Sequence, residues 1–244
     1  MPHFLSRFSQ PRFSLPRFLV ACITLLALAT CGERAPKDKQ GGILVMGDSL
    51  MAWNGTSGRA VSDVMEHRLQ VEVTDRSVSA ARMIYNLPVS GAAGLSIPKQ
   101  LVKGDWDWVV LNGGGNDLWL GCGCAGCKRK LDRLASEDGT EGAIPDLVAQ
   151  LRAKGSRVIY TGYLRSPGRG SPIEYCKDEG EELDRRATQM AARDEGVYFV
   201  SLADIVPYGD RSYHALDMIH PSIKGSDAIG TRIADLIESN RPQN

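Results

Sequence analysis

The sequence lacks the features that mark several common functional classes. Its formal net charge is zero, from 29 basic and 29 acidic residues, and no cluster of arginines stands out. Nucleic acid is therefore not an expected partner, because such partners bind to concentrated basic surface. No glycine-rich stretch continues into G-K-[ST], which excludes a phosphate-binding P-loop. The G-x-S-x-G elbow of α/β-hydrolases is also missing, because Met51 stands in place of its second glycine.

The apolar run Phe18–Ala29 is too short for a membrane span, which needs about 20 apolar residues. It follows a stretch with three arginines and no acidic residue, and Ala27–Ala29 forms an A-x-A cleavage site. We interpret residues 1–30 as a signal peptide. Leu28–Cys31 also resembles a bacterial lipobox, in which Cys31 would carry the lipid. The expected location is periplasmic or otherwise exported, with attachment to a membrane only through a lipidated Cys31. A retained N-terminal anchor helix is the alternative interpretation.

Residues 31–41 are polar with proline and glycine and are expected to form a linker, and residues 42–244 the domain. In the domain, short apolar runs alternate about five times with amphipathic segments, which predicts a three-layer α/β/α fold with a parallel sheet. The expected strands are Ile43–Met46, Val71–Val78, Trp106–Leu111, Val158–Thr161 and Val197–Ser201. The expected helices are Ser57–Leu69, Ala143–Ala153, Asp178–Arg193 and Ser222–Glu238. Ligands of such folds bind at the carboxyl ends of the strands.

Three short motifs follow these elements. Gly47–Leu50 (GDSL) comes directly after the first strand, so that the Ser49 hydroxyl can face the crevice. Gly113–Asp117 (GGGND) follows the third strand, and Asn116 can present an amide donor to an oxyanion. In Asp217–His220 (DMIH), the Asp can hold one imidazole nitrogen while the other takes a proton. Each motif alone has an ordinary interpretation: a capped turn, a glycine turn and a surface loop.

Together, in this order, the motifs make the chain from about residue 42 onward resemble the SGNH/GDSL hydrolases. The resemblance implies a flavodoxin-like fold with a roughly five-stranded parallel sheet, and a serine esterase or lipase-like activity. It implies Ser49 as nucleophile, His220 as base and Asp217 as the residue that orients it. The oxyanion would be bound by the Ser49 N–H, the Asn116 side chain and the Ala80 N–H.

Ala80 stands where the family pattern has glycine, in the block Asp75–Ala80. Alanine keeps the N–H, and the role survives if the site does not demand a positive φ. The implied reaction passes through an acyl-enzyme and requires no metal or organic cofactor. The expected substrate is a small-molecule, carbohydrate or lipid ester. A non-catalytic binding domain of the cell envelope that keeps the fold is the alternative.

The family does not explain four cysteines: Cys122, Cys124, Cys127 and Cys176. In an oxidising compartment two disulfides are the favoured interpretation, and their connectivity cannot be deduced from sequence. A four-thiolate zinc site and free or redox-active thiols are the alternatives. Three aromatic residues near the motifs, Trp53, Trp119 and Tyr163, line the cleft or belong to the core.

Overall fold

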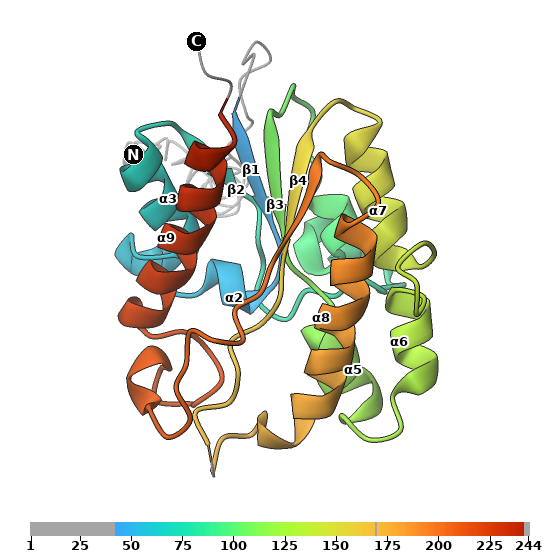
Figure 1. The fold of residues 1–244 in the computed structure, drawn as a ribbon, viewed down its shortest axis with the longest axis vertical. Coiled ribbons are helices and arrows are strands. Elements are labelled where there is room, and N and C mark those ends of the chain that lie inside the picture. The colour runs from blue at the N-terminus through green and yellow to red at the C-terminus, as the bar shows by residue number, and fades with distance from the viewer. Residues whose placement is uncertain (1–41, 169, 242–244) are drawn as a thin grey trace, which may run out of the picture. The chain divides into compact units, whose positions relative to one another are not determined.

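The structure is a computed structural model that describes residues 42–168 and 170–241. The expected signal peptide and linker lie outside these residues. Five parallel strands form one sheet in the order β2-β1-β3-β4-β5. Figure 1 shows the sheet in the middle of the domain, between two layers of helices. The strands are β1 (Ile43–Met46), β2 (Val73–Asp75), β3 (Trp108–Leu111), β4 (Arg157–Thr161) and β5 (Val197–Val200). The predicted three-layer, five-stranded architecture is confirmed.

Helices cover both faces of the sheet (Figure 1). On one side lie α3 (Val61–Leu69) and α9 (Ile223–Ser239), and on the other α5 (Gly115–Cys122), α6 (Lys128–Leu134), α7 (Ala143–Arg152) and α8 (Lys177–Ala191). Shorter segments are α2 (Ser49–Ala52), α4 (Pro88–Ser90), η1 (Gly55–Ser57), η2 (Gly91–Leu95), η3 (Ile97–Gln100), η4 (Glu174–Cys176) and η5 (Arg211–Tyr213). No helix of the described ranges is long and apolar enough to cross a bilayer.

The core forms because apolar faces of the helices meet a sheet that is apolar on both sides. All four residues of β1 and all four of β3 are buried, as expected for central parallel strands. On α9, Ile229, Ile233 and Ile237 recur at a spacing of four residues and pack, fully buried, on the same cluster as Val61 and Met65 of α3. This packing fixes the strands whose carboxyl ends carry the motifs.

The segment between β3 and α7 folds into α5 and α6, two helices that the sequence analysis did not predict. Disulfides join Cys122 to Cys127 and Cys124 to Cys176. The favoured disulfide interpretation of the four cysteines therefore holds. Because their sulfurs are bonded in pairs, the zinc and free-thiol alternatives do not apply.

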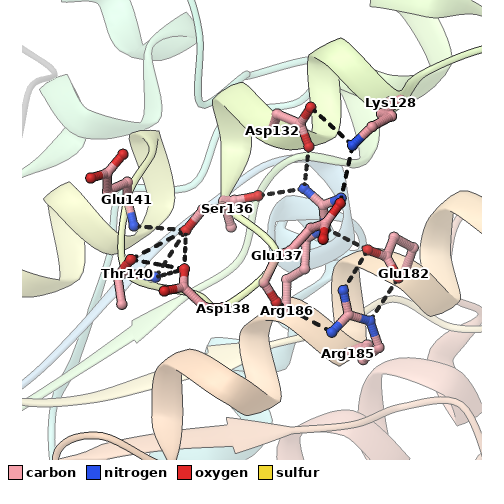
Figure 2. Close-up of polar contacts among 11 residues, drawn as sticks. Lys128, Asp132, Ser136, Glu137, Asp138, Thr140, Glu141, Glu182, Arg185 and Arg186 are labelled. Atoms are coloured by element: carbon pink, nitrogen blue, oxygen red, sulfur yellow. Dashed lines mark hydrogen bonds and ion pairs between the residues drawn. The ribbon is translucent and has the colours of Figure 1, made fainter.

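Ion pairs hold the α6 region against α8 (Figure 2). The guanidinium of Arg186 on α8, whose side chain is only 3% exposed, pairs with Asp132 at 2.9 Å and with Glu182 at 2.6 Å. It also donates to the Ala135 carbonyl at 2.7 Å. A buried cation with three acceptors is well compensated, and the position of α8 relative to α6 is thereby fixed.

Candidate active site

The first motif lies at the switch point of the sheet, where β1 is flanked by β2 on one side and β3 on the other. Gly47 directly follows β1, where a Cβ would overlap the Asn112 Oδ1 atom. That amide oxygen accepts the Asp48 N–H at 3.0 Å. The Asp48 carboxylate in turn caps α2 by accepting the Leu50 N–H at 2.9 Å. Ser49 is thus held at the first position of α2.

The N–H groups of Ser49 and Ala80 make no hydrogen bond to any other group in the described part of the chain. For Ser49 this follows from its place in the first turn of a helix, where backbone donors have no intrahelical partner. Such a free donor, next to the serine hydroxyl, is what an oxyanion requires.

The second motif starts α5 and pins the loop that carries Ala80. Asn116 donates to the Ala81 carbonyl at 3.1 Å through Nδ2, and the same nitrogen lies 3.5 Å from Asp48 Oδ2. The buried Asp117 carboxylate accepts the N–H groups of Met83 and Ile84 at 2.9 and 3.0 Å. Burial raises the pKa of Asp117 in spite of these bonds. The two side chains therefore fix the loop after β2 against α5.

The third motif holds its imidazole by the carboxylate three residues earlier. His220 Nδ1 lies 2.6 Å from Asp217 Oδ2, and Asp217 Oδ1 accepts the N–H groups of Ile219 and His220 at 3.0 Å each. Burial works to raise the pKa of Asp217, but the hydrogen bond from the His220 ring and those two N–H groups outweigh it and lower the pKa. An ionised Asp217 keeps Nδ1 protonated and leaves Nε2 as the acceptor.

The indole of Trp53 packs against the face of the His220 imidazole. The two rings are stacked, with centroids 3.8 Å apart and planes 5° apart. Trp53 is the residue that ends α2, where its N–H donates to the Ser49 carbonyl at 3.0 Å. One short helix therefore carries Ser49 at its start and the stacking partner of His220 at its end.

Ser49, Asn116 and His220 line the same cavity, of about 420 Å³. Asp217 and Ala80 are not among the lining residues. Asp217 is connected to the cavity through its hydrogen bond with His220. Trp119 and Tyr163 do line the cavity. In the described residues no hydrogen bond joins Ser49 Oγ to His220. Catalytic hydrogen bonds are often loose before substrate binds, so this geometry is compatible with a Ser–His pair.

Ala80 has a φ of +65°, in the left-handed region that favours glycine. It occupies the third position of the turn Val78–Ala81, closed by the Ala81 N–H donating to the Val78 carbonyl at 3.0 Å. The position thus demands the conformation for which the family pattern has glycine. Alanine meets it with backbone strain of about 1–2 kcal/mol, and its N–H is retained.

Sequence reasoning did not assign the role of Tyr163. Its hydroxyl donates to Asp48 Oδ2 at 2.6 Å and accepts the Gly115 N–H at 3.0 Å. The close approach needs Gly115, because a Cβ there would lie 2.7 Å from the phenol ring. Burial raises the pKa of Asp48, and hydrogen bonds from Tyr163 and others only partly oppose this. Tyr163 therefore connects the first motif to the second.

The other two histidines of the described residues do not join the site. His67 is exposed on α3. His214 is 5% exposed, and neither of its ring nitrogens has a hydrogen-bond partner among the described residues. Burial lowers the pKa of His214. It is not a lining residue of the cavity.

Solved structures with this fold have low sequence identity to the chain. A proposed SGNH hydrolase from Slackia heliotrinireducens is 20% identical with a TM-score of 0.57, over 82% of this chain and 100% of its own. An acetyl xylan esterase is 15% identical with a TM-score of 0.56, over 80% and 99%. A family two carbohydrate esterase from Clostridium thermocellum, solved with cellohexaose, is 18% identical with a TM-score of 0.51, over 84% and 66%. No curated protein matches the sequence.

The domain therefore has the fold of the SGNH hydrolases. The chain belongs to the GDSL-like lipase/acylhydrolase family, whose family model matches residues 45–228.

Proposed function

We propose that this chain is an exported serine esterase that hydrolyses an acyl ester through Ser49, His220 and Asp217. The observation that carries the proposal is that Ser49, Asn116 and His220 line one cavity while Asp217 holds the imidazole. Family membership supports the reaction class. Carbohydrate esterases among proteins of the same fold make acylated sugars one candidate substrate class, beside lipid esters.

The reaction follows from the roles of these groups. Ser49 Oγ attacks the ester carbonyl while His220 Nε2 takes the hydroxyl proton of Ser49. The oxyanion that forms accepts hydrogen bonds from the backbone N–H groups of Ser49 and Ala80 and from Asn116 Nδ2. His220 then gives the proton to the departing alcohol, which leaves an acyl-enzyme. Water, deprotonated by His220, attacks the acyl carbonyl and releases the acid and Ser49.

Turnover of p-nitrophenyl acetate by residues 42–244, beside the Ser49→Ala variant, tests this proposal. We expect the variant to fall to the rate of the uncatalysed reaction, and a fluorophosphonate to label Ser49 in the parent, as mapped by mass spectrometry. Equal rates for the two proteins and no adduct at Ser49 would contradict the proposal. They would leave a non-catalytic cell-envelope domain, the interpretation that the strained Ala80 turn favours.

Export is part of the proposal, because disulfides persist in oxidising compartments and the structure contains two of them. Fractionation of cells that express the full chain tests it. We expect the mature protein outside the cytoplasm. Incorporation of labelled palmitate that is lost in the Cys31→Ser variant would distinguish a lipid anchor from a soluble periplasmic protein, and retention of the uncleaved chain in the cytoplasm would contradict export.

A further inference from the structure

The cavity at Ser49 is much larger than an acetyl group requires. At about 420 Å³ it lies in the range of roughly 300–1,000 Å³ found for sites that hold drug-sized ligands. From Ser49, Asn116 and His220 it extends between α5, η4 and α8. Its walls there are mostly apolar: Leu118, Trp119, Leu164, Ile173, Leu183 and Val206. An apolar ligand portion continuous with the reacting ester would be removed from water along this extension.

The lysine and the arginine at the cavity each pair with a carboxylate, whereas the lining residue Glu174 has no ion-pair partner among the described residues. Arg165 forms an ion pair with Asp184 at 2.7 Å, in which both side chains are less than one fifth exposed. Lys177 pairs with Glu181 at 2.8 Å along the surface of α8. Both cations are thus neutralised by partners on α8. The pairing favours an uncharged ligand portion over an anionic one.

Two links across the cavity wall hold its shape. The Cys124–Cys176 disulfide joins the loop after α5 to the end of η4. Beside it, the Trp119 indole N–H donates to the Tyr175 hydroxyl at 2.9 Å. Cys124, Cys176 and Trp119 are themselves lining residues. The wall is therefore fixed before a ligand arrives, which reduces the ordering that binding would otherwise require.

A glycine in the first turn of α8 adds to the open volume. Gly180 lines the cavity, and outside its own helix a Cβ there would meet, among the described residues, only the Arg165 guanidinium, at 3.1 Å. Glycine is disfavoured in helices, so a larger residue at this position would be compatible with α8 itself. A side chain at Gly180 therefore takes up space at the cavity wall and requires the Arg165 guanidinium to shift, and it does not meet the core.

We propose that this cavity binds a medium-length aliphatic acyl chain, such as hexanoyl to decanoyl, which makes esters of such acids better substrates than acetate esters. The inference rests on the proposed esterase function, and it names the acyl group that the function leaves open. The ester carbonyl lies at Ser49, and the chain runs from it between α5 and α8.

The test is a series of p-nitrophenyl esters from acetate to dodecanoate, each below its solubility limit, with residues 42–244. Each methylene that becomes fully buried is expected to raise kcat/KM about fourfold. We therefore expect kcat/KM to rise on the order of tenfold or more from acetate to hexanoate, and to fall again once the chain exceeds the cavity. Gly180→Leu is expected to lose this gain in kcat/KM for hexanoate over acetate, and Gly180→Ala to lose part of it.

The outcomes separate the two proposals. Turnover that depends on Ser49 but is constant or falls from acetate onward would overturn the acyl-chain proposal and leave the esterase intact. A chain-length preference that Gly180→Leu does not change would also overturn it, because the chain would then bind elsewhere. Turnover that is unaffected by Ser49→Ala would overturn the esterase proposal. In that case the test is binding of octanoate to the Ser49→Ala protein, measured by Trp fluorescence with acetate as the control. Binding of octanoate but not of acetate would show that the cavity holds the chain, and no binding would overturn the acyl-chain proposal as well.

Discussion

The indole of Trp53 lies parallel to the imidazole of His220, with ring centroids 3.8 Å apart, and Trp53 directly follows the short helix that begins with Ser49. In the proposed reaction His220 becomes an imidazolium when it takes the serine proton. A cation over the face of an indole is stabilised by about 0.5–2 kcal/mol. Trp53 therefore favours the charged form that exists in the transition state.

We predict that Trp53→Leu lowers kcat by about 3- to 30-fold, because the imidazolium of the transition state loses a stabilising contact. Trp53→Phe keeps a ring and should recover part of kcat. Steady-state kinetics with p-nitrophenyl acetate measure this. Equal losses of kcat in Trp53→Leu and Trp53→Phe would indicate that the aromatic face does not stabilise the imidazolium.

Asn116→Ala removes a side-chain donor to the proposed oxyanion. We expect kcat to fall on the order of 10²–10³-fold with little change in KM, because the lost bond forms mainly in the transition state. Steady-state kinetics with p-nitrophenyl acetate measure this. Asn240→Ala, which removes an amide at the end of α9, is the control and should keep full activity. Normal turnover by Asn116→Ala would remove Asn116 from the oxyanion site.

Tyr163→Phe leaves the buried Asp48 carboxylate with one donor fewer and the Gly115 N–H without its acceptor. We expect a loss of about 1–3 kcal/mol in the free energy of unfolding, measured with urea. Because Asp48 also lies beside the Asn116 amide, we expect kcat to fall about tenfold while KM stays constant. A change in KM alone would instead assign the hydroxyl to substrate binding.

Ala80→Gly should relieve the strain of a positive φ. We expect the free energy of unfolding to rise by about 1 kcal/mol, with activity kept or increased. Its neighbour Ser79 does not have a positive φ, so Ser79→Gly should lower stability instead. Parallel urea titrations compare the two. A loss of stability in Ala80→Gly would show that the turn tolerates alanine without strain.

The burial of His214 predicts that the folded protein loses stability in acid. Burial lowers its pKa in the folded state, so between that value and the unfolded value of about 6.5 the unfolded chain binds more protons. Folding free energy is therefore lost as the pH falls below about 6.5. His214→Leu should lack this contribution, so its stability should decline less steeply between pH 7.5 and pH 5. Parallel declines for both proteins would contradict the prediction.

The strands and the larger helices could be predicted because their apolar patterns are simple. Ile43–Met46 is buried on all sides and agrees with its predicted bounds. The second strand, Val73–Asp75, is shorter than the run Val71–Val78. After Asp75 the N–H groups of Arg76 and Val78 still donate to the carbonyls of Val45 and Gly47, but the segment is no longer a regular strand. An apolar run therefore gives the place of a strand more accurately than its ends.

The parts of the site that depend on long-range contacts were not predictable. The cysteine pairing, the short helices α5 and α6 and the bond from Tyr163 to Asp48, 115 residues away in sequence, depend on the packing of the whole domain. The glycine of the first motif could be recognised from sequence, but its reason is the Asn112 side chain that occupies the space of a Cβ. A single sequence carries no record of such neighbours.

The Cys124–Cys176 bond spans a sequence separation of 52 residues, closes a loop that includes α6, α7 and β4, and has both of its cysteines in the cavity wall. A chain that matures in a reducing cytosol lacks this covalent closure and has to rely on the weaker contacts around it. Substrate preference would then be acquired during maturation, and recombinant protein prepared with and without oxidative folding could differ in selectivity while having the same sequence.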